Sequence, residues 1–176
     1  PGDDPQKWLK TAAAHANDGV FQKAVEDPDC TGMGTTLVAA LAGNGKAVLL
    51  NEGDSRAYHI TRDGITRITR DHSVVEDLVA KGDLTPEQAR RHPQKNLITR
   101  ALGTSRKVKA DLFQETAAEG DWLLLCSDGL INEVTDQEIY QEIQNGGTPQ
   151  EVCQRLVTRT LDSGAPDNVT VVLFHL

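Results

Sequence analysis

The sequence is poor in positive charge. It carries 18 Lys and Arg residues against 26 Asp and Glu residues, which gives its 176 residues a formal net charge of −8 at pH 7. Nucleic acids and anionic membrane surfaces bind to basic faces, so this balance argues against both as general partners and permits cation binding. We therefore expect neither nucleic acid nor a membrane among the partners.

Paired cysteines, a leader and long apolar runs are also lacking. The three cysteines are odd in number and show no metal-ligand spacing, and Cys126 lies in an apolar run, where a buried free thiol is expected. No basic-plus-apolar leader is found, and no apolar segment approaches the roughly 20 residues of a membrane span. These features predict a cytoplasmic protein. The length and the 38% hydrophobic content suit one globular domain with a substantial core.

The periodicity of apolar residues predicts a mixed fold with antiparallel strands. Near-helical spacing predicts an amphipathic helix over Lys7 to Val25. Short apolar runs around Gly-rich and Asp-Gly turns predict two hairpins, and two further strands follow later in the chain. The predicted strands are 35–42, 46–51, 58–60, 65–68, 122–126 and 169–176. A Thr followed three residues later by Glu or Gln marks three further helix starts. These starts are Thr85, Thr135 and Thr148.

Three aspartates stand beside predicted strands in separate parts of the chain. Asp128 follows the strand at 122–126, Asp167 precedes the last strand, and Asp54 interrupts a strand-like stretch beside Gly53. If the last two strands are antiparallel neighbours, Asp128 and Asp167 lie at the same edge of a sheet. Clustered carboxylates need a cation, and all-oxygen ligands favour Mg²⁺, Mn²⁺ or Ca²⁺ over zinc. Asp is also a common turn residue, so a turn role stands beside the ligand role at each position.

Five motifs in order add to this pattern. The motifs are GMGTTLVAAL from Gly32, GDSRAY from Gly53, DHS from Asp71, SDGL from Ser127 and DNVTVV from Asp167. The ordered set resembles the metal-dependent Ser/Thr protein phosphatases of the PPM (type 2C) family, most closely its bacterial members, over nearly the whole chain. The resemblance implies an α+β fold, an α/β/β/α sandwich of two antiparallel sheets flanked by helices.

The resemblance also implies a site. By this similarity Asp128 and Asp167 correspond to ligands of a binuclear metal centre, and Asp54 corresponds to a ligand of a third metal. The supporting residues are Gly53, Gly129 and Asn168. The implied cofactors are two or three Mn²⁺ or Mg²⁺ ions in a complete domain. A metal-activated water is the implied nucleophile, so no catalytic side chain is assigned.

The implied reaction is hydrolysis of phosphoserine and phosphothreonine in proteins. Phosphoproteins are then the substrates, a Ser/Thr kinase system is the implied partner, and signalling is the implied role. His72 and His92 are candidates for protonating a leaving alkoxide, but a histidine near a turn is more often structural, and neither is assigned.

Two features depart from the family pattern. Family members begin with two strands that carry an acidic metal ligand and a phosphate-binding Arg, followed by a DGMGG-like motif, and this sequence shows none of them. We therefore expect 1–176 to form a single PPM-type domain without its N-terminal strands, with a mobile flap-like region at 71–102. Glu52 replaces the apolar residue that usually precedes GDSR. It either faces solvent or adds charge near the site.

The missing motifs leave alternatives to an active enzyme. A non-catalytic phosphatase-like module that binds or regulates partners is one, and an inactive fragment of the enzyme is another. Retention of Asp54, Asp128 and Asp167 favours descent from an enzyme, because a module released from catalysis has no physical need for mutually repelling carboxylates. A plain divalent-ion sensor is weaker still, since the sequence shows no EF-hand-like loop.

Overall fold

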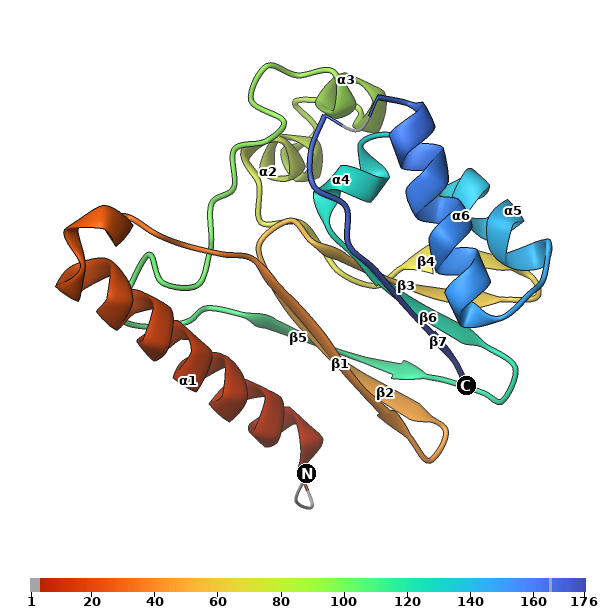
Figure 1. Cartoon of the computed structure of the whole chain (residues 1–176), viewed down its shortest axis with the longest axis horizontal. Helices are drawn as coiled ribbons and strands as arrows, with labels where there is room; N and C mark the ends of the chain where they lie inside the picture. The colour runs from red at the N-terminus through yellow and green to blue at the C-terminus, as the bar shows by residue number, and fades with distance from the viewer. Residues whose placement is uncertain (1–3, 165) are drawn as a thin grey trace. The chain divides into compact units, whose positions relative to one another are not determined.

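The computed structural model describes residues 4–164 and 166–176 (Figure 1). Contacts within the chain define two compact units. The first unit comprises Pro1–Leu41, Val48–Asp54 and Arg70–Phe113, and the second comprises Ala42–Ala47, Ser55–Thr69 and Gln114–Leu176. The single domain expected over 1–176 stays a prediction. Within the described residues, no helix has both the length and the apolar character needed to cross a membrane.

The chain forms six α-helices and seven strands in its described part. The helices are α1 (Pro5–Glu26), α2 (Val74–Lys81), α3 (Pro86–Arg90), α4 (Asp128–Ile131), α5 (Asp136–Gln144) and α6 (Pro149–Asp162), with a 3₁₀ turn at Pro28–Cys30. The strands are β1 (Leu37–Gly43), β2 (Lys46–Glu52), β3 (Arg56–Thr61), β4 (Gly64–Arg67), β5 (Asp111–Thr116), β6 (Trp122–Cys126) and β7 (Val171–His175). They form two sheets, ordered β1-β2-β5 and β4-β3-β6-β7. Two antiparallel sheets flanked by helices confirm the predicted α+β class.

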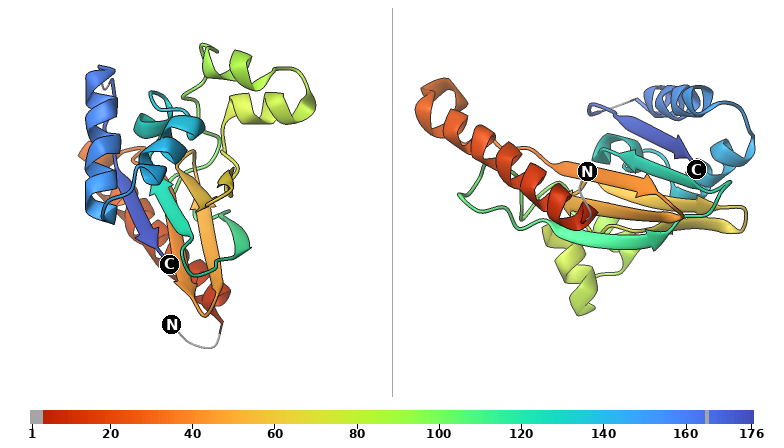
Figure 2. Two further views of the ribbon diagram at one scale, coloured as in Figure 1. Left: turned by 90° about the vertical axis from the view of Figure 1, so that its right-hand side faces the viewer. Right: turned by 90° about the horizontal axis from the view of Figure 1, so that it is seen from below.

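Helix α1 packs along the three-stranded sheet (Figure 2). The Asp4 side chain accepts a hydrogen bond from the Lys7 backbone N–H and caps the helix start, and the helix ends before the proline of the 3₁₀ turn. Leu9 and Ala13 are buried against Val48 of β2 and its neighbours. The predicted helix is thus confirmed, and its apolar face forms the core of the first unit.

Two short helices and a returning loop make up the region from Asp71 to Leu102 in the first unit. The Ser73 side chain caps α2, and a capping box at Thr85 begins α3 as predicted. The returning loop is tied down, because the Val74 N–H donates to the Leu97 carbonyl at 3.0 Å and the Thr99 N–H donates to the His72 carbonyl at 2.7 Å. The mobility expected for this region stays a prediction.

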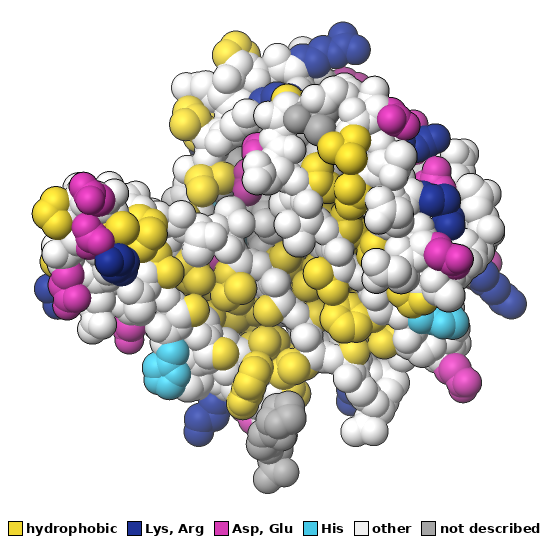
Figure 3. Space-filling view, viewed as in Figure 1, with side chains coloured by type: hydrophobic (Ala, Val, Ile, Leu, Met, Phe, Trp, Pro, Cys, Tyr) yellow, Lys and Arg dark blue, Asp and Glu magenta, His cyan; other side chains and the backbone are white. Residues whose placement is uncertain are grey.

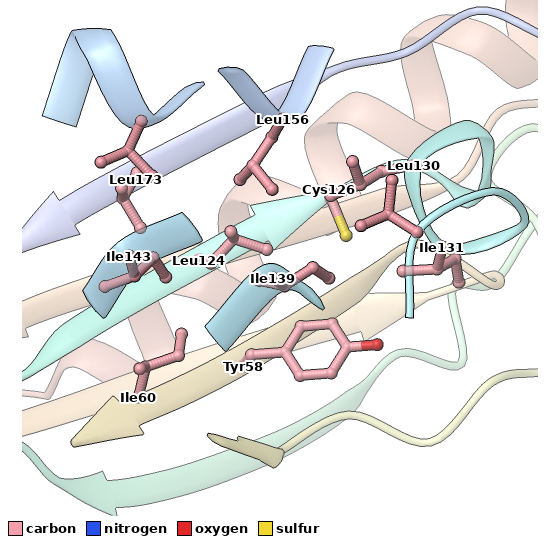
Figure 4. Close-up of a cluster of buried hydrophobic side chains, with 12 residues drawn as sticks. Tyr58, Ile60, Leu124, Cys126, Leu130, Ile131, Ile139, Ile143, Leu156 and Leu173 are labelled. Carbon is pink, nitrogen blue, oxygen red and sulfur yellow. The ribbon is translucent and has the colours of Figure 1, made fainter. Parts of the chain in front are cut away.

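The four-stranded sheet forms the core of the second unit. Its strands are all antiparallel, with Tyr58 of β3 opposite Leu124 of β6 and Leu124 opposite Leu173 of β7. Helices α5 and α6 pack on one face of this sheet, and their apolar side chains meet those of the strands (Figure 4). Cys126 belongs to this core as the buried free thiol that the sequence predicts.

Two polar side chains of β3 are paired within the second unit. The Tyr58 hydroxyl donates to Asp136 Oδ1 at 3.0 Å, and burial raises the pKa of this phenol above its ordinary value. His59 Nε2 lies 2.9 Å from Asp121 Oδ2. Burial alone raises the pKa of Asp121, but hydrogen bonds from His59 and from the Ala118 N–H outweigh it and leave the pKa below its ordinary value of 3.8.

Local capping determines where α5 and α6 begin. Thr135 and Thr148 form complete capping boxes, as predicted. Hydrogen bonds from the backbone N–H and then the hydroxyl of Thr148 lower the pKa of Glu151. Figure 3 shows acidic and basic side chains interspersed over α6, where Arg155 pairs with Glu142 at 3.0 Å. This pair is partly buried and accompanies the packing of the helix face that carries Val152, Leu156 and Thr160.

Candidate metal centre

The antiparallel pairing of β6 and β7 brings the segments of Asp128 and Asp167 together. Beyond the last strand pair, the Ser127 N–H donates to the Thr170 carbonyl at 3.1 Å, and the Thr170 N–H donates to Ser127 Oγ at 3.0 Å. Ser127 Oγ in turn donates to the Asn168 carbonyl at 3.3 Å. The predicted pairing of these strands is confirmed, and both aspartates lie at the same edge of the sheet.

Gly129 lets α4 approach the Asp167 segment closely. A Cβ at this position would lie 2.3 Å from the Asn168 carbonyl oxygen, so a side chain does not fit. Asp167 is exposed and Asp128 is half-buried. The Asn168 N–H donates to Asp167 Oδ1 at 2.7 Å and orients that carboxylate. The supporting roles expected for Gly129 and Asn168 stay predictions, and these contacts are consistent with them.

Asp128 and Asp167 have the donor chemistry of a hard-cation site. Their carboxylate oxygens suit Mn²⁺ or Mg²⁺, which also retain several water ligands. Among the described residues, no group of three or more His, Cys, Asp or Glu side chains is arranged to hold a metal ion. The described residues thus offer two carboxylates of suitable chemistry without a complete ligand set, and the ligand role of Asp128 and Asp167 stays a prediction.

Asp54 follows a tightly constrained glycine in the first unit. Gly53 has a φ of 114°, and a Cβ there would lie 2.4 Å from Thr36 Cγ2. The backbone N–H of His72 donates to the Gly53 carbonyl at 2.9 Å, and the ring Nδ1 of His72 accepts from the Gly53 N–H at 3.1 Å. The turn that carries Asp54 is therefore fixed on both sides. Its convergence with Asp128 and Asp167 stays a prediction.

His72 lies at the wall of a polar cavity of about 350 Å³ within the first unit. Its Nε2 lies 3.0 Å from Asp111 Oδ2, and Arg100 Nη1 lies 3.0 Å from Asp111 Oδ1. Burial raises the pKa of Asp111, but hydrogen bonds from His72 and Arg100 outweigh it, so the pKa is lowered overall. The sequence predicted a structural role for His72 over a role as proton donor, but it did not predict the partners Asp111 and Arg100. The DHS motif was the one local sign of its importance.

The structure also shows the surroundings of Glu52 and His92, whose roles the sequence left open. Glu52 is 3% exposed and its Oε2 accepts from the Lys109 N–H at 2.9 Å, so the solvent-facing interpretation is wrong. Its carboxylate instead lies within the first unit, one residue before the Gly53 turn. His92 Nδ1 accepts from the Gln94 N–H at 3.1 Å, which agrees with a turn-stabilising role for this histidine.

Comparison with known proteins places this fold among those of bacterial serine/threonine phosphatases. No family model matches the chain. It is 37% identical over 171 residues to the serine/threonine phosphatase stp of Listeria innocua, covering 97% of this chain and 68% of that protein. The crystal structure of Stp1 from Staphylococcus aureus superposes with a TM-score of 0.94 at 39% identity, covering 100% of this chain and 69% of that one. The crystal structure of the catalytic domain of PstP in complex with two manganese ions superposes with a TM-score of 0.89 at 39% identity, covering 98% of this chain and 72% of that one.

Proposed function

We propose, because this chain belongs to the PPM (type 2C) family of bacterial serine/threonine phosphatases, that it hydrolyses phosphoserine and phosphothreonine in proteins. One observation of this structure carries the proposal. The β6–β7 pairing delivers Asp128 and Asp167 to one sheet edge, where a module without catalysis has no need for two neighbouring carboxylates. The non-catalytic alternative is therefore not favoured.

Asp128 and Asp167 hold divalent cations in this proposal, and Asp54 holds a further one. When bound, such cations polarise phosphoryl oxygens and make water a nucleophile near neutral pH. The chain's own contribution is to place the carboxylates. Ser127 ties the two segments together, and the Asn168 N–H orients one Asp167 oxygen.

The cofactors that we propose are Mn²⁺ or Mg²⁺, and the manganese complex of the PstP catalytic domain supports Mn²⁺. The proposed substrates are phosphoproteins, because the relatives are named serine/threonine phosphatases. We also propose that a Ser/Thr kinase system supplies these substrates, since only a kinase reaction forms the phosphoester that this enzyme removes. A cytoplasmic location and a role in signalling belong to the same proposal.

Charge-removing, shape-conserving variants test the ligand roles. Loss of a residue that only supports a metal ligand weakens metal binding by about 10- to 100-fold. Asp128→Asn and Asp167→Asn remove ligands themselves, so each should weaken Mn²⁺ binding by more than this. Both should abolish turnover of a phosphothreonine peptide. Asp54→Asn should lower turnover and leave the tightest Mn²⁺ site intact. The matched control is Asp63→Asn, which removes the same charge at an exposed position in the β3–β4 hairpin.

Calorimetric titration with Mn²⁺ and a phosphate-release assay measure these effects. Wild-type binding and turnover in both Asp128→Asn and Asp167→Asn would contradict the proposed centre. Loss of all metal binding in Asp54→Asn would contradict the separate role that we give to Asp54.

A further inference from the structure

One histidine holds both polar groups of the glycine that precedes Asp54. His72 donates its backbone N–H to the Gly53 carbonyl and accepts the Gly53 N–H on ring Nδ1, at 2.9 and 3.1 Å. Gly53 is buried and has a φ of 114°, and Thr36 leaves no space for a side chain. The ring therefore holds the Glu52–Gly53 peptide by its N–H. The carbonyl of the next peptide, Gly53–Asp54, is held by the His72 backbone N–H and by Asn51 Nδ2 at 3.2 Å.

The ring itself is fixed by its other nitrogen. Since Nδ1 accepts a hydrogen bond from a backbone N–H, the proton of the neutral ring lies on Nε2, which donates to Asp111 Oδ2 at 3.0 Å. Arg100 Nη1 lies near both Nε2 and Asp111, at 3.2 and 3.0 Å. Arg100 Nη1 and the protonated His72 Nε2 are both donors, so neither accepts from the other and each donates to the Asp111 carboxylate. Arg100 and Asp111 thus select the tautomer that can accept from Gly53.

Burial makes this arrangement hard to replace. His72 is 5% exposed, so water cannot readily take over the Gly53 N–H if the ring acceptor is lost. The Glu52–Gly53 peptide that the ring holds precedes the Gly53–Asp54 peptide, and only the two backbone torsions of Gly53 separate them. A change in the first peptide is therefore transmitted through Gly53 to the backbone that carries Asp54. We propose that His72 is a positioning residue for Asp54, acting through Gly53 and oriented by Asp111. This inference rests on the metal-ligand role proposed above for Asp54.

Two amide substitutions separate the functions of the two ring nitrogens. In His72→Asn the side-chain oxygen lies near the place of Nδ1 and keeps an acceptor for Gly53. In His72→Gln the amide reaches the place of Nε2 and keeps a donor for Asp111 without the Gly53 acceptor. The matched control is His59→Gln, which alters the similar pair with Asp121 in the second unit.

The readouts are hydrogen exchange of the Gly53 amide, followed by NMR without metal, and Mn²⁺ titration calorimetry. We expect His72→Gln to speed Gly53 exchange by about tenfold or more. It should weaken the Mn²⁺ site that Asp54→Asn also weakens by about 10- to 100-fold. His72→Asn should stay within about threefold of wild type in both readouts. His59→Gln should change neither.

Each outcome decides between the two proposals. Wild-type Gly53 exchange in a folded His72→Gln overturns the positioning role, and equal effects in His72→Asn and His72→Gln overturn the specific acceptor. If His72→Gln does not fold, Asp111→Ala removes the acceptor of the Nε2 proton, leaves the ring in place and should also speed Gly53 exchange. Unchanged exchange in Asp111→Ala overturns the inference. If Asp54→Asn leaves Mn²⁺ binding unaltered, the ligand role of Asp54 fails, while Gly53 exchange still reports on His72.

Discussion

Replacing Gly129 by Ala should damage the candidate metal centre without altering either aspartate. The new methyl carbon would lie 2.3 Å from the Asn168 carbonyl oxygen and 3.0 Å from its carbon, whereas ordinary contacts begin at 3.4 Å. The close-packed interior forces α4 or the Asp167 segment to move by about 1 Å. Overpacking of this kind costs about 1–3 kcal/mol of folding free energy. A displacement of about 1 Å at reacting groups lowers a catalytic rate about 100-fold.

The assay compares Gly129→Ala with Gly19→Ala, because both glycines are helical and only one is crowded. A Cβ on Gly19 would meet nothing within 4 Å, and Ala favours a helix over Gly by about 1 kcal/mol. Gly19→Ala should therefore raise the melting temperature by about 2–4 °C and leave turnover of p-nitrophenyl phosphate in Mn²⁺ unchanged. Gly129→Ala should lower both. A Gly129→Ala protein with wild-type melting and turnover would refute the close approach of the two segments.

Three further changes test the fold of the second unit. In the wild type, ionised Asp121 stabilises the fold above its ordinary pKa of 3.8, and this stability is lost as the pH falls through the lowered pKa of the folded state. Asp121→Asn should therefore reduce the loss of unfolding free energy on acidification, measured by urea unfolding between pH 2 and 6. An unchanged pH dependence would count against the pair with His59. Thr148→Ala removes the cap of α6 and should cost about 1 kcal/mol by the same measurement, whereas no loss would show that the cap with Glu151 is dispensable. Leu156→Ala empties a fully buried position and should cost about 2–5 kcal/mol, so a loss below 1 kcal/mol would mean that the core there repacks freely.

The sequence predicted best where the signal was local. Strand β6 runs from Trp122 to Cys126, as predicted, because a continuous apolar run ends at a polar residue on either side. The helix starts at Thr135 and Thr148 were found because a capping box lies within four residues. The neighbourhood of Asp128 and Asp167 followed from one long-range assumption, that the strands beside them pair.

Elements with weak or competing signals were missed. Strand β5 reads DLFQET, and its two acidic residues, Asp111 and Glu115, together with Gln114 obscure the alternation that marks a strand. Helix α4 begins at Asp128 itself, where a turn was expected. The start of α2 had an available signal, since Ser73 precedes Glu76 by three residues and caps its N–H. The contact of His72 with Gly53 joins residues nineteen positions apart, and no periodic pattern encodes it.

Ser127 extends the hydrogen bonding between β6 and β7 by one residue, and this constrains the length of the connection that leads into β7. The backbone between Asp167 and β7 is tied to Ser127 at both Asn168 and Thr170, so its length has to match the sheet spacing. One residue inserted there would shift the segment by one position against Ser127 and displace Asp167 from its present place at the end of β6 and β7. The exposed end of α6, near Gly164 with its φ of 103°, carries no such tie to Ser127 in the described residues. Natural variation in length between α6 and β7 should therefore accumulate before Asp167 and be excluded after it.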